Sequence, residues 1–126
     1  MQFLMMVSGK ENQGQPPAAM MEAIEQAAEE ATKNGTMVFR GGLYPASQAV
    51  RMRVNGGRLI VTDGPFAEAK EVVGGFAIFE LKSREEALEG AKHFMELHQR
   101  HWPGWVGEIE VRQVWQDAPD LSQSAK

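Results

Sequence analysis

The chain has 126 residues, of which 43% are hydrophobic and 24% charged, with no cysteine and a formal net charge of −4. This size predicts one domain with a single hydrophobic core. The acidic balance argues against nucleic-acid binding by bulk attraction, and the lack of cysteine excludes disulfides, thiolate nucleophiles and zinc–thiolate sites in this chain.

The first predicted element is a strand from Gln2 to Ser8. Every position from Phe3 to Val7 is apolar, which is typical of a strand buried on both faces. This apolar run has no basic lead and is too short for a signal peptide or a membrane span. We therefore expect a cytoplasmic protein with no membrane partner.

A helix is predicted next, from Pro16 to Asn34. Proline is tolerated in the first turn of a helix, and Gly35 is a good C-terminal stop. Apolar residues recur at helical spacing on one face: Met20, Met21, Ile24, Ala27, Ala28 and Ala31. The helix is thus amphipathic and should cover one face of a sheet.

A short strand over 36–39 leads to a predicted hairpin. Asn55-Gly56 is a preferred pair for a two-residue type I′ turn, and this register places Val54 opposite Gly57, Met52 opposite Leu59 and Val50 opposite Val61. The other face carries Arg51, Arg53 and Arg58 with Ile60. These arginines either hold an anionic ligand or form a solvated face that discourages edge pairing.

The second half repeats the strand and helix pattern. The run over 76–79 is again apolar at consecutive positions, and Ser83 followed by Glu86 predicts a capping box at the start of a second helix. A last strand presents Ile109 and Val111, with Trp115 as a further candidate for the same face. Residues 1–116 form the predicted domain, and residues 117–126 a polar tail.

This order of elements predicts an α+β protein: a ferredoxin-like sheet with both helices on one face and an inserted hairpin. Helices on one side cannot cover both faces of two fully apolar strands. A second copy of the chain is the expected cover, so we predict a homodimer whose sheets pack face to face.

The segment that begins at Asp63 supplies the candidate site. Asp63-Gly64-Pro65 predicts a turn in which Asp accepts backbone N–H groups, glycine supplies permissive dihedral angles and proline keeps Gly64 out of the helical region. Asp63, shielded by Phe66, is either a general acid or base or only the cap of its own turn.

Other residues near this turn are candidate ligand contacts. Phe66 is a pocket wall or a dimer contact. Lys70 either neutralises an anionic substrate, together with Arg51 and Arg53, or pairs with a neighbouring glutamate on the surface.

His98 and His101 lie three residues apart on the second predicted helix. They could share a metal ion, but no third ligand stands at motif spacing, so we expect no metal site. A half-buried imidazole or a cation near the helix C-terminus explains them equally well. We expect no cofactor either, since the chain has no phosphate-binding glycine loop, nucleophile elbow or dinucleotide fingerprint.

The segment from Asp63 to Glu71, which reads DGPFAEAKE and is followed by Gly-Gly-Phe at 74–76, resembles the signature of the YCII-related family in its DGPF branch. It departs at Ala69, where the family pattern DGPFAETKE has threonine. The resemblance covers nearly the whole chain and implies a ferredoxin-like subunit, a dimeric α+β barrel and a cleft near the signature. Better-studied relatives pair a helix-borne histidine with an aspartate, but the corresponding helix here, 16–34, has no histidine.

Two functions stay open at this point. The first is an enzyme of proton-transfer, elimination or isomerisation type, with Asp63 as acid or base and an unidentified small molecule as substrate. The second is a non-catalytic ligand-binding or regulatory module. Some members of the family are encoded with or fused to extracytoplasmic-function sigma factors, which implies a functional link of that kind.

Overall fold

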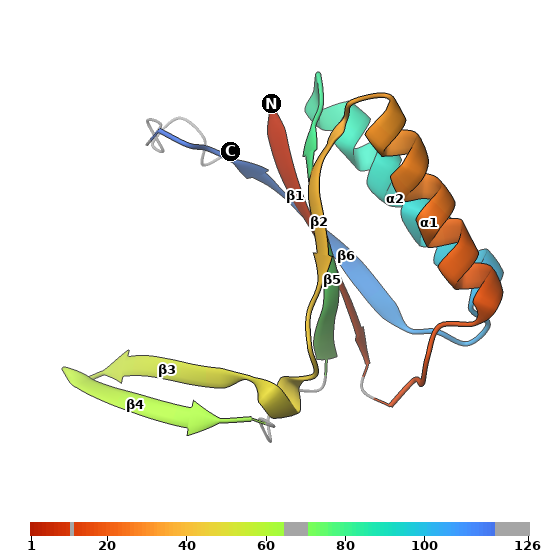
Figure 1. Ribbon diagram of the computed structural model, residues 1–126. Coiled ribbons are helices and arrows are strands. Elements are labelled where there is room, and N and C mark those ends of the chain that lie inside the picture. Colours follow the sequence, from red (N-terminus) through yellow and green to blue (C-terminus); the bar gives the residue numbers. More distant parts are fainter. Residues whose placement is uncertain (11, 65–70, 118–126) are drawn as a thin grey trace.

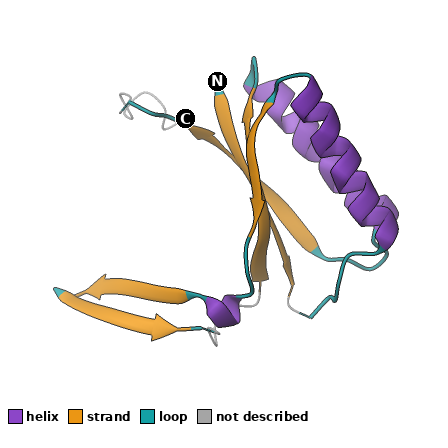
Figure 2. Cartoon of the chain, in the orientation of Figure 1, coloured by secondary structure: helices purple, strands orange, loops and turns teal. Residues whose placement is uncertain are grey.

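The computed structural model describes residues 1–10, 12–64 and 71–117, and these form a four-stranded sheet, two helices and a separate hairpin (Figures 1 and 2). The elements follow in the order β1 (Gln2–Lys10), α1 (Ala18–Lys33), β2 (Met37–Gly42), η1 (Ala46–Gln48), β3 (Val50–Asn55), β4 (Arg58–Asp63), β5 (Glu71–Glu80), α2 (Arg84–His101) and β6 (Gly107–Val114). The predicted α+β class and the order of its elements are confirmed.

The main sheet has the strand order β2-β5-β1-β6, and all neighbouring strands are antiparallel. Each helix connects two strands that have one other strand between them: β5 lies between β1 and β2, and β1 lies between β5 and β6. This is the split βαβ arrangement of the ferredoxin-like motif. The first strand of the chain therefore lies inside the sheet.

Both helices cover the same face of this sheet (Figure 1). Phe3 and Met5 of β1 point toward them and pack against Ala87 and Ala91 of α2. A second cluster, formed by Met20, Ala23 and Leu97, joins the two helices. The side chains at alternate positions of β1 thus form the core, as the period of a strand requires.

The predicted capping box begins α2. The Ser83 hydroxyl accepts a hydrogen bond from the Glu86 N–H at 3.1 Å, and the Glu86 carboxylate accepts one from the Lys82 N–H at 3.2 Å. The second bond comes from the residue before the cap rather than from the cap itself. The prediction of the helix start is confirmed.

We call the face of the main sheet that the helices do not cover the open face. Its apolar side chains come from three neighbouring strands and are partly or largely exposed: Leu4, Met6, Phe39, Phe76 and Ile78. The Phe39 and Phe76 rings lie 5.9 Å apart, and Phe39 is 56% exposed. The predicted burial of the apolar strands on both faces is therefore not met within one copy of the chain.

The hairpin β3–β4, which we call the arm, extends away from one end of the main sheet on the side opposite to the helices (Figure 1). Its turn is Gly56-Gly57, with φ angles of 61° and 77°, and not the predicted Asn55-Gly56. Two glycines adopt these positive angles without steric cost, and the register then places leucine rather than glycine opposite Val54. The pairing register shifts by two residues, so each side chain stays on its predicted face.

Gly41 and Gly42 lie within β2, where Gly41 leaves room for the Phe76 ring. Trp115 lies one residue beyond β6 and is exposed. Among the described residues, neither helix combines the length and the apolar character needed to cross a lipid bilayer.

Candidate functional site

The turn at the base of the arm is fixed by a close approach of two backbone segments. The Gly64 N–H donates to the Ala49 carbonyl at 2.7 Å, and a Cβ atom on Gly64 would lie 1.9 Å from the Ala46 carbonyl oxygen. The φ angle of Gly64 is outside the left-handed region. Glycine is therefore required here for space rather than for a positive φ angle.

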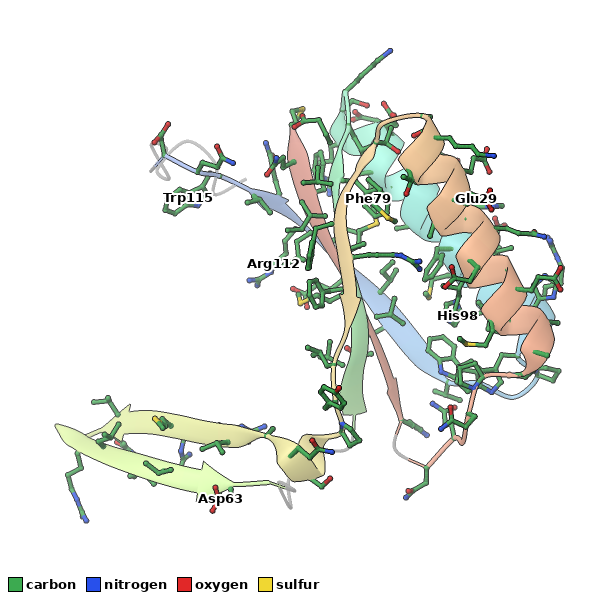
Figure 3. The ribbon with its side chains drawn as sticks, in the orientation of Figure 1. Glu29, Asp63, Phe79, His98, Arg112 and Trp115 are labelled. Carbon is green, nitrogen blue, oxygen red and sulfur yellow. The ribbon has the colours of Figure 1, made fainter. Side chains whose placement is uncertain are left out.

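Asp63 ends β4, directly before this turn, and lies opposite Val50 of β3. Its side chain is exposed and projects outward from the arm (Figure 3). Phe66, which was predicted to shield it, and Lys70 both lie outside the described residues, as does most of the signature segment. The structure thus positions the candidate acid or base on a fixed strand end but shows it open to solvent.

The arginines of the arm occupy its other face. In the observed register Arg51 lies opposite Thr62, Arg53 opposite Ile60, and Arg58 opposite Asn55. Side chains alternate between the two faces of a strand, so Asp63 and these arginines point to opposite sides of the arm. Within one copy, Asp63 therefore does not share a pocket with Arg51 or Arg53.

Two shallow hollows occur on the surface of the described residues. One, of about 490 Å³, lies on the outer side of α1 and is lined by polar residues: Gln26, Glu29, Glu30, Lys33 and Asn34. The other, of about 630 Å³, lies between α2 and β6, with Trp105 and Met95 among its lining residues. Asp63, Arg51 and Arg53 do not line either of these two hollows.

A cluster of aromatic rings lies at the C-terminal end of α2, around His98, which is only 4% exposed. Its ring centroid lies 4.5 Å from that of Trp105 and 5.0 Å from that of Phe94, and its Nδ1 lies 2.9 Å from the Phe94 carbonyl oxygen. Burial lowers the pKa of His98, against a smaller opposite effect of this hydrogen bond. The neutral imidazole is thus a core side chain.

The burial of His98 agrees with one of the interpretations of the helix histidines, that of a buried imidazole. No group of three histidine, cysteine, aspartate or glutamate side chains within the described ranges could hold a metal ion. The helical spacing of His98 after Ala91 and Phe94 was the sequence signal for its burial, and the tryptophans at 102 and 105 complete its surroundings.

Trp105 also closes the end of the main sheet, which the sequence did not indicate. Its ring packs over two glycines that lie opposite each other, Gly9 of β1 and Gly107 of β6. Beside it, the Gln13 side-chain amide donates to the carbonyls of Lys10 and Val106 and accepts from the Val106 N–H, at 2.7–3.0 Å. Side chains of the same copy thus cover this end of the main sheet, whereas the arm is exposed.

Comparison with known proteins gives a family but no activity. A family model described as the YCII-related domain matches residues 1–116. The uncharacterized protein R00369 of Rhizobium meliloti (strain 1021) is 38% identical over 92 residues, which are 73% of this chain and 68% of that protein.

Among solved structures, the chain is similar to 5-chloro-2-hydroxyhydroquinone dehydrochlorinase from Burkholderia phenoliruptrix AC1100, in complex with 2,5-dihydroxybenzoquinone. The identity is 15%, the TM-score 0.41, and the match covers 94% of this chain and 96% of that one. A likeness of this degree carries no conclusion about the reaction.

Proposed function

This chain belongs to the YCII-related family, and we propose that it is a homodimer that binds a small molecule in a cleft between two copies, beside the turn after Asp63. Within the family we assign it to the DGPF branch, on the signature that starts at Asp63. A cytoplasmic location is part of the proposal and fits a chain without cysteine.

The open face of the main sheet is the observation that carries the proposal. Its apolar side chains extend across three neighbouring strands, and Phe39 is more than half exposed. Monomeric proteins rarely expose a continuous apolar patch of this kind. A second copy, packed face to face, would cover it and give the dimeric α+β barrel that the family resemblance implies.

The enzymatic form of the proposal assigns a proton-transfer, elimination or isomerisation reaction to this cleft. Asp63 is the acid or base, Arg51, Arg53 and Lys70 hold an anionic group of the substrate, and Phe66 is a wall of the cleft. The fixed strand end at Gly64 supports this assignment, because a catalytic group needs a rigid support. A carboxyl group works best as acid or base when it is shielded from water, which here needs the partner.

A second candidate is a non-catalytic ligand-binding module that acts with an extracytoplasmic-function sigma factor. Two observations favour it: α1 carries no histidine that could pair with an aspartate, and Asp63 lies on the opposite face of the arm from Arg51 and Arg53. The two candidates share the same cleft and differ in whether Asp63 takes part in chemistry.

A thermal-shift screen of small anionic metabolites tests the binding site. We expect at least one compound to raise the melting temperature, since a ligand at about one hundred times its Kd stabilises the native state by about 2.7 kcal/mol. Arg51→Gln combined with Arg53→Gln should abolish the shift. If no compound shifts the wild-type protein, or if the double variant shifts equally, the proposed site is wrong.

Asp63→Asn then separates the two candidates. In the enzyme, this variant keeps ligand binding and loses turnover, whereas Asp117→Asn, which removes an exposed carboxylate outside the arm, changes neither. In the non-catalytic module, the ligand returns unchanged from long incubation with the wild-type protein, and Asp63→Asn behaves as wild type.

A further inference from the structure

We propose that the arm is an intersubunit clasp: its apolar face packs on a second copy of this chain, and each copy's arm therefore completes a site at the surface of the other. The inference rests on the proposed homodimer. It adds that the arm of each copy packs on the other copy, and it states which copy supplies each wall of the cleft.

The apolar face of the arm has no cover within its own copy. Its five large hydrophobic side chains are 54–76% exposed: Val50, Met52, Val54, Leu59 and Val61. Met52 lies opposite Val61, and Val54 lies opposite Leu59, so they form one continuous strip. A lone two-stranded hairpin is marginally stable in water, which means that this strip needs a surface to pack on.

The direction of the arm identifies the second copy as that surface. The arm extends on the side of the open face, away from the helices (Figure 1). A copy that covers the open face must therefore lie alongside the arm as well. In a two-fold dimer each contact occurs twice, so both arms and both open faces are covered by one arrangement.

Charge complementarity supports the same partner. The three arginines and one aspartate of residues 50–63 give the arm a formal charge of +2, which leaves −6 on the rest of a chain whose total is −4. On the open face, β6 contributes Glu108, Glu110 and Arg112, which lie opposite Ser8, Met6 and Leu4 of β1, and Glu110 forms an ion pair with Arg112. The opposite net charges of the arm and of the rest of the chain thus favour the approach of two identical copies, with the arginines at the rim of the contact.

This arrangement gives a physical reason for the separation of the candidate site residues. Asp63 shares the face of the arm that carries the apolar strip, so packing on the partner takes it out of open solvent. The arginines on the other face of the arm stay at the rim. The acid or base of the site therefore comes from one copy and the facing wall from the other.

Three matched variants test the inference by sedimentation equilibrium. Met52→Glu places a charge in the apolar strip of the arm, and Phe39→Glu places one on the open face. Met21→Glu makes the same chemical change as the first on the outer side of α1, where methionine is 47% exposed. We expect the first two to raise the dimer Kd at least about tenfold and the third to leave it within about twofold, because buried unpaired charges are strongly disfavoured.

The outcomes separate the arm from the dimer itself. A dimer that Phe39→Glu dissociates and Met52→Glu leaves intact keeps the proposed homodimer and overturns the role of the arm. A wild-type protein that is monomeric at micromolar concentration overturns both. Circular dichroism spectra that match the wild type show that each variant is folded.

A direct measurement uses the lack of native cysteine, which allows a single spin label on the arm through Arg58→Cys. The spin-labelled protein, at natural isotope abundance, is mixed with ¹⁵N-labelled wild type. Only contacts between copies then broaden the amide signals of the ¹⁵N-labelled protein. We expect broadening in the main sheet of the ¹⁵N-labelled copy. Broadening confined to the arm, or none in a sample shown to be dimeric, would overturn the proposal.

Discussion

The two faces of the main sheet carry similar apolar side chains but differ in what covers them. Phe3 and Met5 of β1 are buried under α2, whereas Leu4 and Met6, on the same strand, point to the open face and remain partly exposed. The composition of β1 is thus the same toward both sides, and the helices alone make the difference. The helix-covered face is complete in one copy, and the open face with the arm is complete only in an assembly.

The largest effect that we expect comes from a pair of methionines, one in each region. Met20→Ala removes a fully buried side chain between the two helices and should lower the free energy of unfolding by about 3 kcal/mol. Met52→Ala on the arm, measured in the Phe39→Glu background that keeps copies apart, should change it by less than about 0.5 kcal/mol. Urea denaturation gives both values, and equal losses would remove the distinction between the regions.

A second contrast uses two glycines on the helix-covered side. A Cβ atom on Gly107 would lie 2.2 Å from the Trp105 ring and 2.4 Å from the Ser8 carbonyl oxygen, so Gly107→Ala should cost about 2 kcal/mol. Gly90 in α2 has open space around it, and Gly90→Ala should stabilise the protein by about 1 kcal/mol. Thermal unfolding of both variants checks the two signs.

A third prediction concerns pH. Because burial lowers the pKa of His98 in the folded state, the unfolded state binds more protons as the pH falls below about 6.5, and stability falls with it. His98 thus stabilises the fold above its unfolded pKa and loses this contribution in acid, with a slope of at most about 1.4 kcal/mol per pH unit. Unfolding at pH 7.5 and 5.5 measures it.

Two variants isolate this pH effect. His98→Phe should reduce the difference between the two pH values, and His93→Gln, on the exposed side of α2, should leave it unchanged. A wild-type slope that survives in His98→Phe would assign the effect to other groups.

The smallest global effect is expected at the base of the arm. Gly64→Ala forces the turn away from the Ala46 carbonyl and breaks the hydrogen bond to Ala49, but it leaves the main core untouched. We expect a change in global unfolding below about 0.5 kcal/mol together with loss of hydrogen-exchange protection at residue 64. If global stability drops as much as it does in Met20→Ala, the arm and the core form one cooperative unit.

The sequence predicted the helices and the order of the elements along the chain well, because each element has a local or periodic signal. The apolar stripe of α1 and the Ser83–Glu86 cap of α2 required no knowledge of the rest of the chain. The helix-covered side was therefore predictable in outline. The covering of the end of the main sheet was not predictable. The contact of Gln13 with Val106 joins loops 93 residues apart and has no sequence pattern.

The candidate site was less predictable for steric reasons. Gly64 looked like a residue chosen for its dihedral angles, but its role is a backbone approach to Ala46 that only coordinates reveal. The hairpin turn lies one residue later than predicted, which shifts the pairing register by two residues and keeps every side chain on its face, so the predicted alternation of Arg51 and Arg53 with the apolar strip is correct. The placement of Asp63 and the arginines on opposite faces of the arm results from the same alternation of side chains.

The strand order also has a consequence for synthesis on the ribosome. β1 is synthesised before the other strands of the main sheet, yet it lies between β5 and β6, which are the last two of these strands to be made. At translation rates of 5–20 residues per second, roughly 5–20 s pass between the synthesis of Phe3 and Met5 and that of these neighbours. The apolar side chains of β1 are therefore without their sheet partners throughout this interval.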